Sequence, residues 1–162
     1  MIKALLGLLV AAYASQVEAA QISGPAKAID STIIQIGDQR VMLYGVDSVM
    51  RKQSCLLNGK PWLCWDAAVR DLQAVVDQGT VTCDPVGEPD PYGRVLARCT
   101  VNGHSVNEEY VSRGYGLART SETTDYVAAE AAAKEKKLGL WQGEFKPPGE
   151  FRRFAHILVE RP

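Results

Sequence analysis

The side chains most able to do chemistry in this 162-residue chain are four cysteines and two histidines. His104 and His156 are too few for a multi-histidine metal site. A zinc site is disfavoured as well, because no C-x-x-C pair occurs and neither histidine stands at ligand spacing. The cysteines are therefore interpreted first as a disulfide framework, which requires an oxidising compartment. They are Cys55, Cys64, Cys83 and Cys99.

The N-terminal residues predict that compartment. Lys3 supplies a positive charge, residues 4–14 are apolar, and Val17 and Ala19 provide the small residues that signal peptidase reads. We expect a signal peptide over residues 1–19 and a mature protein that is secreted or periplasmic. An apolar run of about eleven residues is too short to cross a bilayer, so no membrane span is expected in the mature protein. A buried N-terminal helix is the alternative, but no capping pattern supports it.

Four cysteines allow three pairings, and spacing alone does not choose among them. Local structure favours Cys55–Cys64, which would close a short loop before a helix. It also favours Cys83–Cys99, which would join neighbouring strands over residues 80–84 and 94–100.

The remaining pattern predicts one strand-rich domain over residues 20–162. Residues 32–36 and 40–46 flank a Gly-Asp turn and form an expected hairpin. A helix is expected to begin at Pro61 and to end before Gly79. Asn107 is expected to cap a second helix. A third helix is predicted over residues 125–137, and this order of elements is compatible with an OB-type barrel.

Composition limits the class of protein. Hydrophobic residues make up 46% of the chain and charged residues 23%, which excludes a disordered chain, a collagen-like repeat and a coiled coil. The net charge of −1 argues against a strongly basic binder of polyanions, although it leaves room for a local basic patch.

Seven segments resemble, in order and at family spacing, the staphylococcal-nuclease-like (thermonuclease) family. They are Val41–Asp47, Gln53-x-Cys55, Trp62-x-Cys64-x-x-Ala67, Asp90-x-Tyr92-Gly93-Arg94-x-Leu96-Ala97, Val106-Asn107, Gly114 and Gly139-Leu140-Trp141. The resemblance runs from about residue 28 to residue 141. It implies a five-stranded OB-fold barrel with three helices and leaves a C-terminal tail. The family hydrolyses phosphodiesters in DNA and RNA and depends on calcium.

Three positions match the functional residues of that family. Asp47 falls on a metal-binding aspartate, Arg94 falls on one of two phosphate-binding arginines, and Tyr92 falls on the tyrosine beside it. These matches imply a metal ligand and a binding site for an anionic ligand.

Other positions differ from the family pattern. Met42 stands at the position where the family has the first of its two arginines. Met50 stands at the position where the family has the glutamate that acts as the base. Ser31 stands at a second aspartate in an ungapped match, whereas a one-residue gap would make Asp30 that metal ligand. Arg40 lies two residues before Met42 on the same strand face, so its long side chain either reaches the site or lies in solvent.

Methionine neither accepts a proton from water nor donates a hydrogen bond to phosphate. The chain is therefore expected to be an impaired family member that acts as an accessory or anionic-polymer-binding domain without a cofactor. Its expected partner is nucleic acid or acidic polysaccharide, and no oligomeric state is predicted. The resemblance extends to exported homologues encoded with exopolysaccharide pathways of the succinoglycan type. The alternatives are an active nuclease that uses calcium and a purely structural domain.

Overall fold

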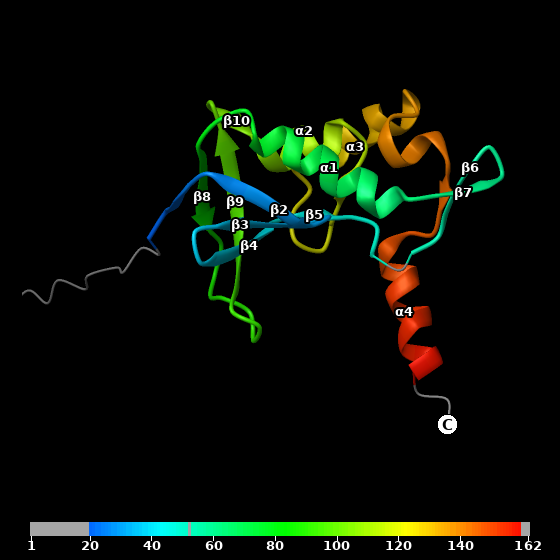
Figure 1. Ribbon diagram of the computed structural model, residues 1–162, viewed down its shortest axis with the longest axis horizontal. Coiled ribbons are helices and arrows are strands. Elements are labelled where there is room, and N and C mark those ends of the chain that lie inside the picture. The colour runs from blue at the N-terminus through cyan, green and yellow to red at the C-terminus, as the bar shows by residue number, and fades with distance from the viewer. Residues whose placement is uncertain (1–19, 52, 160–162) are drawn as a thin grey trace, which may run out of the picture.

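The computed structural model describes residues 20–51 and 53–159, so the expected signal peptide lies outside the described residues. Most of the strands form a curled sheet, and the helices other than the C-terminal one lie on one side of it (Figure 1). The helices are α1 (Cys64–Val76), α2 (Val106–Ser112), α3 (Val127–Glu135), the 3-10 helix η1 (Gly139–Gln142) and α4 (Pro148–Val159). The strands are β1 (Ile22–Gly24), β2 (Ala26–Asp30), β3 (Ile33–Ile36), β4 (Gln39–Leu43), β5 (Val46–Asp47), β6 (Cys55–Leu57), β7 (Lys60–Trp62), β8 (Val81–Pro85), β9 (Arg94–Val101), β10 (His104–Ser105), β11 (Leu117–Ala118) and β12 (Glu144–Phe145).

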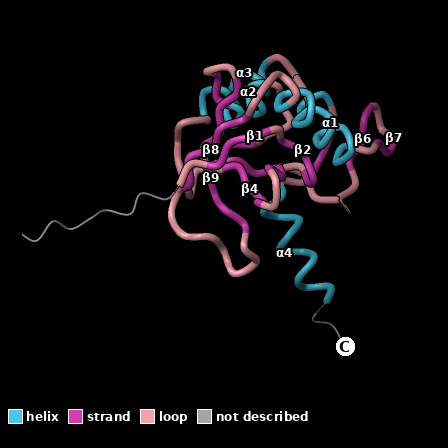
Figure 2. Tube along the Cα trace, turned by 60° about the vertical axis from the view of Figure 1, so that its left-hand side comes forward, coloured by secondary structure: helices cyan, strands magenta, loops and turns pink. Residues whose placement is uncertain are grey.

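The main sheet has the strand order β1-β8-β9-β4-β3-β2, with β10 paired to β9. The expected hairpin is confirmed, because β3 and β4 pair antiparallel around the Gly37 turn. Strand β4 pairs parallel to β9, which places Met42 beside Leu96 and Arg40 beside Arg94. Pro25, which has no N–H, separates β1 from β2, and these two strands pair at opposite ends of the sheet order. The curled sheet with its helices confirms the OB-type fold (Figure 2).

Two buried clusters hold these layers together. The larger one fills the space between the sheet and helices α1 and α2, with Ile34, Leu43, Leu72 and Tyr110 among its fully buried side chains. The smaller one lies beneath the β6–β7 hairpin and contains both Cys55 and Cys64. The smaller cluster therefore supports the loop that follows β5.

Asn107 connects the sheet to α2 and does not cap that helix, so the expected cap is wrong. Ser105 is the cap residue, and its side chain accepts a hydrogen bond from the Glu108 backbone N–H. The fully buried Asn107 side chain donates to the carbonyl of Tyr44 and accepts from the Cys99 N–H. A buried amide with such partners fixes the spacing of β4 and β9, because any shift would leave backbone groups unpaired.

Both expected disulfides are confirmed. Cys55 pairs with Cys64, and Cys83 pairs with Cys99. Helix α1 begins later than predicted because of the β6–β7 hairpin. Pro61 pairs with Leu56 in the β6–β7 hairpin, and the helix begins only at Cys64. Such bridges are compatible with an extracellular or periplasmic protein.

Helix α4 was not predicted from the sequence. It begins at the second of two consecutive prolines, so Pro148 is at its first position and Glu150 is in its first turn, and both residues favour a helix N-terminus. The helix extends away from the sheet (Figures 1 and 2). Its first turns nevertheless reach the loops at the end of β5, where Arg152 contacts Asp47.

Removing the Cys83–Cys99 bridge should lower the free energy of unfolding by about 3 kcal/mol, because the unfolded chain gains the freedom of a 16-residue loop. Urea unfolding of the oxidised protein and of the Cys83→Ser/Cys99→Ser double variant measures this difference. Thiol labelling with intact-mass analysis before and after reduction is the control. Free thiols in the protein isolated from an oxidising compartment would contradict the two bridges.

Candidate functional site

A hollow of about 350 Å³ lies where β2, β4, β5 and the start of β9 meet α4. Five of the residues predicted from the sequence line it together. They are Asp30, Met42, Asp47, Met50 and Arg94. Ser31, the other candidate for the second aspartate position, lines it as well, whereas Arg40 and Tyr92 do not.

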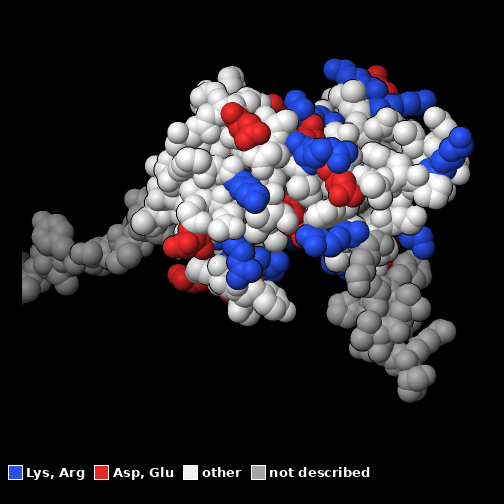
Figure 3. Space-filling view, viewed as in Figure 1, with Lys and Arg blue, Asp and Glu red and all other residues white. Residues whose placement is uncertain are grey.

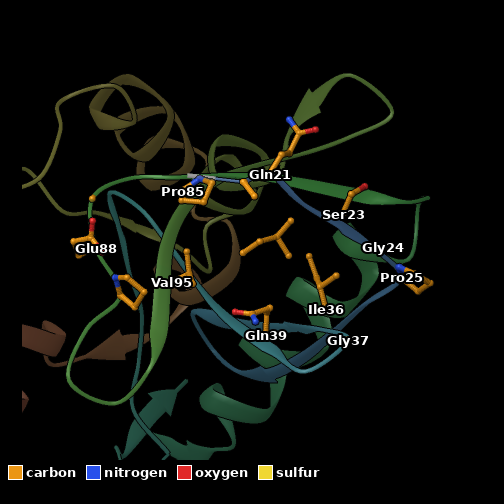
Figure 4. A pocket seen from close by; sticks show the side chains of 14 residues that line it. Gln21, Ser23, Gly24, Pro25, Ile36, Gly37, Gln39, Pro85, Glu88 and Val95 are labelled. Carbon is orange, nitrogen blue, oxygen red and sulfur yellow. The ribbon is translucent and has the colours of Figure 1, made fainter. Parts of the chain in front are cut away.

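A larger hollow of about 630 Å³ lies between β1, the β3–β4 turn and the loop before β9 (Figure 4). Its walls include Ile22, Ile36, Val95 and Pro85, and Glu88 is the one charged residue among the described residues that line it. These mainly apolar walls offer little for acid–base or phosphate chemistry, so the smaller, more polar hollow is the candidate site.

Asp47 lies at the end of β5 and is held by two guanidinium groups. Arg152 Nη1 and Nη2 donate to Oδ1 and Oδ2, the first at 3.0 Å, which forms a two-pronged pair. Arg119 Nη2 lies 3.6 Å from Oδ1, and the Ser48 backbone N–H donates to the same atom at 2.9 Å. Burial acts to raise the pKa of Asp47, but the Arg152 hydrogen bonds and the positive charges of Arg119 and Arg152 outweigh it, so the pKa is lowered.

The Asp30 carboxylate accepts hydrogen bonds from neighbouring protein groups. Its Oδ1 accepts hydrogen bonds from the Ser31 backbone N–H at 2.7 Å and from Trp65 Nε1 at 2.9 Å. The buried Ser31 hydroxyl donates to the Val49 carbonyl at 2.7 Å. Both residues thus have local partners that fix the turn after β2.

Met42 and Met50 occupy the positions where the resemblance implies an arginine and a glutamate. Met42 lies on β4 between Ile33 and Leu96, so its position is set by the sheet register. The loop carrying Met50 is fixed by Gln53, whose side chain accepts from the Met50 N–H and donates to the Lys146 carbonyl. The hollow therefore presents thioethers at these two positions, and a thioether is at most a weak acceptor.

Arg94 is oriented by its neighbours in the loop before β9. Its Nε and Nη2 both contact Asp90 Oδ2, at 2.7 and 2.6 Å. Its guanidinium lies 5.2 Å from the centre of the Tyr92 ring, which is 73% exposed. Arg40 donates to the Tyr92 carbonyl and so supports this loop from outside the hollow. A guanidinium beside an exposed ring is suited to a ligand that is both anionic and planar.

Arg119 and Arg152 were missed by reasoning from the sequence. Arg119 follows β11 and also pairs with Glu122, whereas Arg152 lies on α4. Arg152 and Arg153 are adjacent basic residues in the C-terminal tail of the sequence. The contact of Arg152 with Asp47 joins residues 105 positions apart, and such a contact leaves no local sequence pattern.

Comparison with known proteins agrees with the fold. A family model described as staphylococcal nuclease homologue matches residues 40–143. The chain belongs to this family. It is also 35% identical over 68 residues to an uncharacterized protein of Bacillus anthracis. That alignment covers 38% of this chain and 32% of the Bacillus protein, so it spans about a third of the relative's length.

The donors in the hollow do not fit the calcium ion that the nuclease family uses. Calcium is bound by six to eight oxygen ligands, with carboxylates providing the charge. Here both oxygens of Asp47 are occupied by Arg152, and a methionine stands where the glutamate is expected. Within residues 20–51 and 53–159, no group of three acidic, histidine or cysteine side chains could hold a metal.

The same ranges contain no helix long and apolar enough to cross a bilayer.

The Asp47 pairing predicts a specific pH dependence of stability. Because the folded-state pKa is lowered, the pairing stabilises the protein above the unfolded pKa and is lost as pH falls through the folded one. At pH 7, Asp47→Asn should lower the free energy of unfolding by about 1 kcal/mol, since Arg152 is partly exposed.

The difference between wild type and Asp47→Asn in urea unfolding should shrink as pH is lowered from about 5 to about 2. Asp38→Asn, in the exposed turn between β3 and β4, is the matched control for loss of one carboxylate. A difference that stays constant over this range would contradict the assigned pairing.

Proposed function

We propose that this nuclease-family domain binds an anionic polymer in the candidate hollow and does not cleave it by the calcium-dependent mechanism of the family. One observation carries the proposal: Arg152 occupies both oxygens of Asp47 in a hollow that also contains Met42 and Met50. The arrangement favours recognition of negative charge over catalysis.

The missing groups have a large effect on rate. A positioned general base contributes about 10²–10⁴-fold, and Met50 cannot act as one. A preorganised group that stabilises developing charge contributes about 10²–10³-fold, and Met42 cannot replace an arginine in that role. These factors are not strictly additive in free energy, but both act against cleavage.

Nucleic acid is the polymer that the side chains favour. Arg94 can contact a phosphate while the exposed Tyr92 ring beside it stacks on a base. Basic and acidic side chains are interspersed on the face shown in Figure 3, so the affinity is expected to depend on a few arginines and not on a broad basic surface.

An acidic polysaccharide is the second candidate ligand. Guanidinium groups bind carboxylates in the same two-pronged geometry, and Asp47 with Arg152 is an example within this chain. The resemblance to homologues encoded with exopolysaccharide pathways supports an accessory role in a pathway of that kind. Export, which the N-terminal sequence predicts, is supported by the two disulfides.

An active calcium-dependent phosphodiesterase is the alternative function. The observation in its favour is that Asp30, Asp47 and Arg94 line one hollow. It would require Asp47 to exchange two guanidinium groups for a metal ion and another group to serve as the base.

Digestion of plasmid DNA and RNA, with calcium and with chelator, tests the two functions. We expect no calcium-dependent cleavage, together with measurable binding of DNA, RNA or an acidic polysaccharide. Arg94→Gln should weaken that binding about tenfold, because it removes charge-assisted contacts. Arg70→Gln, on the exposed face of α1 and outside this hollow, removes the same charge and should change it little.

Calcium-dependent cleavage that disappears in Arg94→Ala would overturn the proposal and support the active nuclease. Absence of both cleavage and binding would instead support a structural domain.

A further inference from the structure

Arg119 and Arg152 lie together on the wall between two hollows. Both residues, with Asp47, line the candidate hollow and also a second one of about 330 Å³. The second hollow is bounded by Thr120 and Ser121 after β11 and by the start of α4. The two hollows are therefore adjacent, and the arginine pair separates them.

The pair already holds a planar oxyanion, namely the Asp47 carboxylate. Arg152 grips both of its oxygens, and Arg119 adds a charge at 3.6 Å. A guanidinium has five N–H donors, and Arg152 uses two of them on Asp47. The Arg152 side chain is 39% exposed, so a ligand in either hollow can reach it.

We propose that Arg119 and Arg152 form a second anion-binding subsite, which Asp47 fills in the free protein. An anionic group of the bound polymer takes the place of Asp47 on Arg152, while Arg94 holds the neighbouring anionic group. This inference rests on the proposed function and extends it from one anionic group to two.

Asp47 has partners other than Arg152. In the free protein the Ser48 backbone N–H donates to its carboxylate, and Arg119 Nη2 lies 3.6 Å from Oδ1. Two acidic side chains nearby limit the gain from a bound anion: Glu122 pairs with Arg119, and Glu130 lines the second hollow. The subsite is therefore a site of modest affinity in which Asp47 competes directly with the ligand.

Arg152 also lies outside the matched part of the chain. The match to the family model ends at residue 143, and α4, which carries Arg152, begins after that residue. Ligand binding at this subsite would break the Asp47 contact and so change how α4 is held against the barrel. The tail whose role the sequence left open thus supplies a binding residue.

Asp47→Asn and Arg152→Gln should change affinity in opposite directions. Asp47→Asn removes the competing carboxylate and should tighten binding about threefold or more. Arg152→Gln should weaken binding and make its salt dependence shallower by about 0.7 in the log–log slope for a single strand. Arg153→Gln, an exposed neighbour that donates to the Gly149 carbonyl, loses the same charge and should change neither quantity.

Fluorescence anisotropy at several salt concentrations measures both quantities. The probes are a labelled oligothymidylate of about twelve nucleotides, a length in the range that OB folds bind, and in parallel a labelled polygalacturonate. Circular dichroism melting confirms that each variant is folded.

The outcomes separate the two proposals. If Arg94→Gln weakens binding but Asp47→Asn and Arg152→Gln behave like Arg153→Gln, the domain binds the polymer and the second subsite is wrong. If Asp47→Asn weakens binding, Asp47 is not a competitor and the subsite is also wrong. If neither probe binds to any variant, Asp47→Asn included, both proposals fail.

Discussion

The Asp47 carboxylate is the point at which the barrel, the candidate hollow and the C-terminal helix meet. The resemblance to the nuclease family implies a metal ligand at this position, and in this chain two guanidinium groups contact the carboxylate. The pairing neutralises a half-buried charge that would otherwise be costly to hold inside the protein. It also joins α4 to β5 across 105 residues, so the charge balance of the hollow depends on a segment beyond the matched residues.

The sheet and the disulfides fix the positions of the residues that line the candidate hollow. Asn107 fixes β4 and β9 relative to each other, and the register of those strands places Met42 and Arg94 on neighbouring segments. The Cys55–Cys64 bridge holds the hairpin beneath which the smaller buried cluster lies. Buried apolar side chains and the two disulfides stabilise this barrel.

Features encoded locally were predictable from the sequence. The Gly-Asp hairpin follows from a short turn pattern, and both disulfides follow from cysteines beside expected strands and a helix. The helix that was expected to start at Pro61 shows the limit of such signals, because pairing within the β6–β7 hairpin overrides a residue that suits a helix. Asn107 shows another limit. Its side chain suits a cap, but burial between β4 and β9 gives it stronger partners. The contact of Arg152 with Asp47 required the tertiary structure.

Isothermal titration calorimetry with calcium is the most direct test of the central claim. The claim is that Asp47 is paired with Arg152 and does not bind a metal ion. A calcium site needs a cluster of charged oxygen ligands, and both carboxylate oxygens of Asp47 are already paired with Arg152 in this chain. The account predicts no saturable binding of calcium below about 1 mM, the range of weak extracellular sites. Tighter saturable binding by the wild-type protein that is lost in Asp47→Asn would contradict it.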